Sequence, residues 1–161
     1  MAEYRANAAQ TVLAGQPVMF TESPVPCNRG LIFHRDESGI FRIANAAGNN
    51  GWGYPTWGCC CCNRMPETIY EVAFHANIAI PTGGTVEAIS LAIAIDGEID
   101  PSSTMIITPA AVEEYGNVGA DIIVAVPAIC RCSTVSVRNT SNQPILVQNA
   151  NLVFDFQGVR A

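Results

Sequence analysis

Lysine is absent from this 161-residue sequence, and all eight basic residues are arginines. Charged residues make up only 14% of the chain, against about 25% in an average soluble domain. The arginines form no basic run, which excludes a general nucleic-acid binder. Apolar stretches fall short of the roughly 18 residues of a membrane span, and the start lacks the basic-then-apolar pattern of a secretory signal. We therefore expect neither a nucleic acid nor a membrane as partner.

The apolar content is high enough for a folded core. Apolar residues make up 49% of the chain, the net charge is −6, and the length suits a single domain. Soluble sheets often protect their free edges with lysine. A sheet protein that has none must hide its edges by closure or by assembly, so we expect part of the surface to be buried against other subunits.

Helical periodicity is also missing, since no window of 12 residues sustains an apolar repeat of 3.6. Apolar and small or polar residues instead alternate, and turn signals such as Asp96-Gly97 separate the runs. This pattern predicts an all-β sandwich or barrel of about nine short strands. The expected strands are residues 70–80, 86–95, 118–126, 135–138 and 146–156, with shorter ones at 17–21, 31–35, 40–44 and 104–108.

Four segments carry a resemblance to the tumour necrosis factor and complement globular-head superfamily. Tyr70–Ile78 resembles its central strand, and Ile89–Gly97 resembles the next strand and turn. Val135–Asn139 and Ile145–Phe156 are similar to its last hairpin. The resemblance covers roughly residues 8–157. Within this superfamily, the sequence is most similar in character to bacterial and phage versions. These are domains of collagen-like spore-surface glycoproteins and trimeric phage head-fibre or decoration proteins.

The resemblance implies a two-sheet antiparallel jelly-roll sandwich that forms a compact homotrimer. We expect residues 12–161 to form this domain, with a Gly/Trp/Cys-rich loop at 45–63. Residues 1–11 precede the sheet pattern and are a candidate docking or strand-exchange segment. The residues expected in the core or the trimer interface are Tyr70, Phe74, Leu91, Leu152, Phe154 and Phe156.

The sequence has no Gly-X-Y collagen run, and the domain begins almost at Met1. We therefore favour a phage virion decoration or head-fibre protein that binds a capsid or other shell protein. Such a protein would assemble in the bacterial cytoplasm and reach the virion surface before release by lysis. The alternative is an exosporium-type domain on the spore surface.

The seven cysteines leave several possibilities open. Cys59 and Cys62 have Cys-x-x-Cys spacing, and Cys130 and Cys132 would project to one side of an extended segment. These four thiolates could hold a structural zinc ion, but disulfides or buried thiols are the favoured interpretation. Redox catalysis is disfavoured because the βαβ context of a redox Cys-x-x-Cys motif is missing.

Three aromatic residues lie in the glycine-rich loop: Trp52, Tyr54 and Trp57. Such rings can stack on a sugar or anchor a protein, which makes a receptor- or glycan-binding head a further possibility. The favoured alternative is that they cap one end of the sandwich or trimer, because tryptophan is usually buried.

No motif indicates catalysis, so we expect no enzyme and no cofactor. His34 lies near Asp36 and Glu37 in a turn, which is more typical of a solvated hairpin than of a proton-transfer site. His75 is expected in the interior or an interface. The alternating acidic residues Asp96, Glu98 and Asp100 could bind calcium, but they lack the length and glycine placement of a calcium loop.

Overall fold

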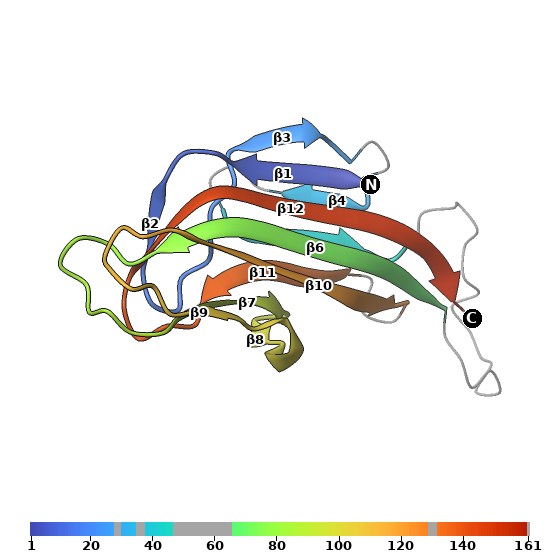
Figure 1. The fold of residues 1–161 in the computed structure, drawn as a ribbon. Coiled ribbons are helices and arrows are strands. Elements are labelled where there is room, and N and C mark those ends of the chain that lie inside the picture. The colour runs from blue at the N-terminus through green and yellow to red at the C-terminus, as the bar shows by residue number, and fades with distance from the viewer. Residues whose placement is uncertain (28–29, 35–37, 47–65, 129–131, 161) are drawn as a thin grey trace.

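The computed structural model describes residues 1–27, 30–34, 38–46, 66–128 and 132–160, which form two antiparallel β-sheets (Figure 1). Each sheet has six strands. Sheet one contains β1 (Ala2–Ala6), β2 (Gln10–Val12), β3 (Glu22–Val25), β6 (Glu67–Ala79), β10 (Gly116–Pro127) and β12 (Ile145–Arg160). Sheet two contains β4 (Ile32–His34), β5 (Ile40–Ala44), β7 (Ile89–Ile95), β8 (Glu98–Ile99), β9 (Met105–Ile107) and β11 (Cys132–Asn139).

The order of the strands brings distant parts of the chain together. Sheet one runs β10-β6-β12-β1-β3, with β2 also pairing with β12. Sheet two runs β4-β5-β11-β7-β8, with β9 also pairing with β7. A short 3₁₀ helix, Pro101–Ser103, lies between β8 and β9. In the described ranges, no helix is long and apolar enough to span a bilayer.

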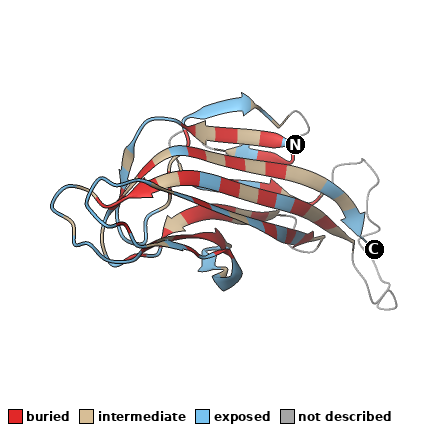
Figure 2. Ribbon diagram, viewed as in Figure 1, coloured by how far each residue is buried: buried red, intermediate tan, exposed pale blue. Residues whose placement is uncertain are grey.

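The core lies between the two sheets and follows the alternation of the sequence. Along β6 and β12, buried and more exposed residues alternate, as Figure 2 shows by its stripes. Strand geometry causes this pattern, because successive side chains point to opposite faces. Aromatic rings from both sheets meet in the middle: Tyr4 and Phe154 from sheet one contact Phe41 from sheet two, with ring centroids 4.6 and 5.2 Å apart.

The structure confirms the two-sheet antiparallel jelly-roll sandwich and its long alternating strands. Residues 17–21 differ from the expectation, because only Pro17 makes a β-bridge, to Arg138. The reason is that this segment crosses between the sheets. The amide of Val18 donates to Val137 in sheet two at 2.8 Å, whereas the amide of Thr21 donates to Arg5 in sheet one at 3.1 Å.

The first twelve residues also differ from the expectation. β1 lies between β12 and β3, and β2 pairs with β12 near the start of that strand. The sheet therefore begins at Ala2 rather than after residue 11. Docking or strand exchange by this segment stays a prediction.

Candidate functional site

Three of the four sheet edges are short or covered in the described part of the chain. β3 has four residues, including Pro24, and β4 has three. The edge of β7 is covered by β8, the 3₁₀ helix and β9. There Ser103 Oγ accepts a hydrogen bond from the amide of Ile93 at 2.8 Å and donates one to its carbonyl at 3.2 Å. Such devices stop a sheet from pairing with another chain.

The fourth edge, β10, is different. It has 12 residues, and among the described strands only β6 pairs with it. Its Ile123 side chain is 62% exposed, and the strand has no lysine. Asn45 donates to the carbonyl of Val126 at 2.6 Å, which covers the edge near its end. The rest of β10 is a long edge of the kind that commonly pairs or packs with a second chain.

The outer face of sheet one continues inward from this edge. We use this name for the side chains that point away from the core on β1, β6, β10 and β12. On it, Ala73 lies opposite Val153 on one side and opposite Asp121 on the other, so apolar and charged side chains are neighbours. Arg5 donates twice to Oε1 of Glu3, at 2.8 and 2.6 Å, so this pair is already satisfied within the chain.

Asn151 occupies a position near the middle of the outer face. It lies on β12, opposite His75 on β6 and opposite Arg5 on β1. A bulge precedes it, because the register between β12 and β6 shifts between Gln148 and Asn151. Asn149 in the bulge has a φ of 53°, a left-handed conformation that asparagine tolerates better than most residues. Bulges commonly re-aim side chains near functional sites.

His75 fills the space on the other side of β6. It lies opposite Gly119 on β10, and a Cβ atom built on Gly119 would overlap Nδ1 of the imidazole. The missing side chain at Gly119 therefore lets the ring lie across β10. His75 is exposed in the single chain. The structure thus places it on the outer face rather than in the interior of one subunit.

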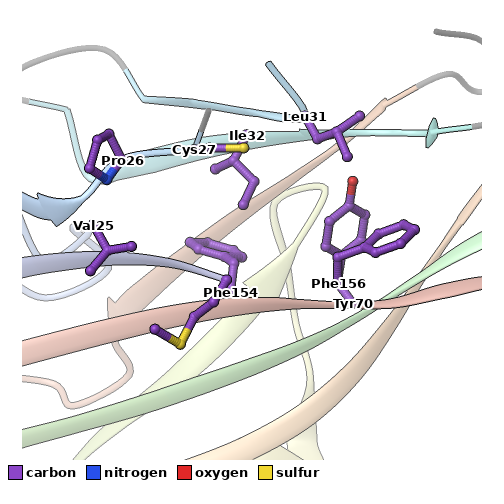
Figure 3. A pocket seen from close by; sticks show the side chains of 9 residues that line it. Val25, Pro26, Cys27, Leu31, Ile32, Tyr70, Phe154 and Phe156 are labelled. Atoms are coloured by element: carbon purple, nitrogen blue, oxygen red, sulfur yellow. The ribbon is translucent and has the colours of Figure 1, made fainter. Parts of the chain in front are cut away.

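A pocket of about 350 Å³ opens between the sheets near one end of the sandwich (Figure 3). Phe154, Phe156 and Tyr70 line it from sheet one, and Leu31 and Ile32 line it from the start of β4. The free thiol of Cys27 also faces it. Tyr70 and Cys27 are the titratable side chains among the described residues that line it.

Two tyrosines near this pocket have perturbed pKa values. Burial, and secondarily the nearby Cys27, raises the pKa of Tyr70 to about 12 and also raises that of Tyr4. The Tyr70 hydroxyl donates to the carbonyl of Ala44, which joins β6 in sheet one to β5 in sheet two. The Tyr70 hydroxyl therefore contributes a hydrogen bond between the two sheets.

Comparison with solved structures identifies the architecture. The globular domain of zebrafish complement 1qA protein aligns over 94% of both chains, with a TM-score of 0.54 and 11% identity. The Eiger TNF of S. frugiperda aligns over 95% of this chain and 88% of that chain, with a TM-score of 0.59 and 10% identity. The fold is a tumour necrosis factor-like jelly roll. No family model and no curated protein sequence matches the chain. These identities are low, so the likeness shows the fold alone.

The expected core or interface residues lie inside the jelly roll. Tyr70, Phe74, Leu91, Leu152 and Phe154 are fully buried between the sheets. Phe156 is partly buried and packs at the edge of this cluster, with its ring 6.1 Å from that of Tyr70. These side chains belong to the core of a single chain; a contribution of any of them to a trimer interface stays a prediction.

Several expected site residues fall outside the described residues: Trp52, Tyr54, Trp57, Cys59, Cys62 and Cys130. The glycan-binding loop and the four-cysteine site therefore stay predictions. Cys132 begins β11 and, like Cys27, is a partly buried free thiol.

The candidate polar groups have partners within the fold. His34 Nε2 donates to the carbonyl of Ser38 at 2.7 Å, and its ring stacks on Phe41 with centroids 4.3 Å apart; Asp36 and Glu37 are not among the described residues. Asp96 accepts from the amide of Thr134 at 2.7 Å, and Asp100 from that of Ser102 at 2.9 Å. Within the described ranges, no group of three or more His, Cys, Asp or Glu side chains could hold a metal ion.

Sequence reasoning missed the outer face, and above all Asn151. One signal was available. Asparagine is depleted in strands, yet Asn151 stands in the middle of a run with strong alternation. An amide at such a position indicates a requirement other than sheet formation.

Proposed function

We propose that this jelly roll is a non-enzymatic module that works as a homotrimer on the surface of a phage particle, as a decoration or head-fibre protein. The observation that carries the proposal is the free edge of β10 beside the uncovered outer face of sheet one. The sequence resemblance implies a homotrimer, and we assign this surface to the contact between its subunits.

Assembly would explain why the β10 edge and the outer face of sheet one are left exposed in a single chain. In the described part of the chain, most of the 12-residue β10 edge has no paired strand and carries an exposed isoleucine, so a monomer risks pairing with any other strand. A closed ring of copies covers such surfaces without forming fibres, because closed symmetry leaves no open end. The mechanism is geometric: three copies bury their edges around one axis, one end docks on the shell and the loops at the other end face outward.

The absence of an enzymatic role is part of the proposal. Two of the candidate titratable groups, Tyr70 and His34, each donate to a backbone carbonyl, which supports a role in packing. The phage setting is supported by the similarity of the strand motifs to bacterial and phage versions of the fold.

The oligomeric state is tested by sedimentation velocity with the full chain between about 1 and 100 µM. We expect a species of three times the chain mass over most of this range. Because an obligate interface holds copies together at micromolar concentration, a monomer throughout the range overturns the trimer and with it the proposed function.

The location is tested by immunogold labelling of phage particles banded from a lysate of the source culture. An antibody raised against the purified protein should label the particle surface, and the same antibody absorbed with the protein is the control. Label confined to the surface of spores from that culture supports the spore alternative instead. Label on neither particle rejects both locations.

A further inference from the structure

Four connections lie together at the end of the sandwich opposite the two termini (Figure 1). They are residues 13–16 after β2, 80–88 between β6 and β7, 108–115 between β9 and β10, and 140–144 between β11 and β12. We call these four connections the loop end, and the structure describes every residue in them. Because they come from distant parts of the chain, the surface that they share exists only in the folded jelly roll.

Side-chain hydrogen bonds join the connections of the loop end to one another. Asn139, the last residue of β11, donates to the carbonyl of Val12 at 3.0 Å and to that of Gln143 at 2.8 Å. Gln143 in turn donates to the carbonyl of Thr85 at 2.8 Å and accepts from the amide of Thr85 at 2.9 Å. These bonds fix the positions of residues 13–16, 80–88 and 140–144 relative to one another.

The fourth connection is held in a strained conformation. Glu113 has a φ of 60°, a left-handed value that few residues other than glycine, asparagine and aspartate adopt. Its amide donates to the carbonyl of Ile80 at 2.8 Å, and its carboxylate accepts from the hydroxyl of Thr82 at 2.7 Å. Strain of this kind is concentrated at functional sites. A surface that is fixed in advance also loses less conformational entropy when a partner binds.

The loop end exposes large apolar side chains. They are Leu13, Val86, Val112 and Tyr115, which are 57, 51, 37 and 39% exposed. Single exposed apolar residues are ordinary on a protein surface. These four, however, are among only eleven such residues in the described part of the chain, and they share one interlocked end. Such a concentration indicates a contact with another molecule.

The charge of the loop end has a single sign. Glu87, Glu113 and Glu114 lie on it, and no arginine does. The arginine nearest to it in sequence, Arg138, donates to the hydroxyl of Ser136 on its own strand at 3.2 Å. The three carboxylates repel a phosphate group, an anionic lipid surface and the loop end of a second copy. They attract an occupant that carries basic residues.

We propose that the loop end is a docking surface for a different protein chain, whose contact area is apolar at its centre and basic at its rim. This inference rests on the proposed function. It assigns the loop end to the contact with the shell protein and turns the end with the two termini outward. Docking and trimer formation then use separate surfaces, because the β10 edge and the outer face of sheet one are left for the contacts between copies.

The test measures binding of the purified trimer to particles of the source phage from which the gene for this chain has been deleted. A variant that combines Leu13→Ser with Val86→Ser is compared with Val159→Ser. Val159 is a matched control, because it lies near the end of β12 at the opposite end of the sandwich and is 49% exposed, against 51% for Val86. Because all three side chains are exposed, sedimentation and thermal melting should give wild-type values for both variants.

The expected results separate the two ends. The double variant should raise the dissociation constant for the particle by at least about a hundredfold, since burial of each apolar side chain contributes about a factor of ten. Val159→Ser should leave the dissociation constant unchanged. Glu87→Gln should weaken binding and reduce its dependence on salt, because a charge at the rim has been removed. Glu98→Gln, an exposed carboxylate on β8, should change neither quantity.

Three results overturn the inference. If the double variant binds the particles as well as the wild-type chain does, another surface docks, and the proposed function stands without this inference. If wild-type trimers associate with each other in sedimentation and the double variant does not, the occupant of the loop end is a second copy. If the wild-type trimer does not bind the particles at all, the docking step of the proposed function falls together with the inference.

Discussion

The two sheets of this jelly roll differ in the length of their edge strands and in how those edges are covered. Sheet two ends in strands of two or three residues, and the 3₁₀ helix between them ties Ser103 to Ile93 on β7. Sheet one has strands of 12, 13 and 16 residues in a row, the first of which is an edge. Sheet one also contains Asn151, whose buried Oδ1 accepts no hydrogen bond from the described residues.

This difference separates the sheet edges that the chain covers by itself from the edge that it leaves exposed. Both sheets bury apolar side chains of their long strands in the shared core, so the contrast does not come from poor folding. It concerns the β10 edge and the outer face of sheet one. The described edges of sheet two are short or covered, whereas the β10 edge is long and covered only near one end, which is why we propose this side for contact with other copies.

The largest effect should come from the core that both sheets share. Phe154→Ala in sheet one and Phe41→Ala in sheet two each remove a fully buried ring, and the two rings lie 5.2 Å apart. We expect each variant to lose about 3–5 kcal/mol of unfolding free energy in urea denaturation followed by circular dichroism. Val153→Ala, next to Phe154 on the outer face, is the control and should lose much less. Two separate transitions in either core variant would show that the sheets do not fold as one unit.

The edges should differ in their effect on assembly. Ile123 on β10 and Ile106 on β9 are matched, with 62% and 64% of the side chain exposed. Ile123→Lys should convert the trimer to a monomer in light scattering, because a buried isoleucine contributes about 1.5–3 kcal/mol and the lysine brings charge to each interface. Ile106→Lys should leave the mass unchanged. Equal behaviour of the two variants would remove the distinction between the sheets.

Removal of one hydroxyl oxygen, that of Ser103, should weaken the cover on the β7 edge of sheet two. Ser103→Ala leaves the amide of Ile93 without the acceptor that it now has at 2.8 Å, in a fully buried position. We expect a loss of about 1–3 kcal/mol of unfolding free energy, and faster hydrogen exchange at Ile93 by NMR. The control is Ser102→Ala, whose exposed hydroxyl donates to Asp100 and should matter far less. Unchanged exchange at Ile93 would mean that Ser103 does not close this edge.

The smallest expected effect is on stability at alkaline pH, through the Tyr70 hydrogen bond that joins the two sheets. Tyr70 has its pKa raised to about 12 by burial, whereas an unfolded tyrosine titrates near 10. Between these values the unfolded chain loses the proton and the folded chain keeps it, so stability present below pH 10 is lost as the pH rises to 12. Tyr70→Phe should flatten the fall of the melting temperature over this window. Tyr115→Phe, in the loop before β10, is the control; a wild-type slope in Tyr70→Phe would contradict the assignment.

The sequence predicted those parts of the fold that depend on local alternation. β6 and β12 were recognisable because many residues in a row alternate between the core and the outside, and Tyr70, Phe74 and Phe154 could be placed in the core for the same reason. The Asp96-Gly97 turn was recognisable because Asp-Gly is a common pair in tight hairpin turns that need a positive φ. Both residues adopt a positive φ in the structure, of 52° and 89°.

Other features depend on which strands become neighbours, and the local pattern does not contain that information. Residues 17–21 look like a strand, but they make hydrogen bonds to both sheets because they cross between them. β1 has only five residues, so its place between β12 and β3 in sheet one was not evident. The neighbours of Asn151 were not evident either, because Arg5 and His75 come from distant segments.

The central position of β12 has a consequence for synthesis on the ribosome. β6 and β1 both pair with β12, which is the last strand to be made. Sheet one therefore cannot close until β12 has been made, whereas every strand of sheet two has been made before β12 begins. Nascent chains should wait with one side of β6 and one side of β1 unpaired until then, which makes chaperone access during that interval a determinant of yield.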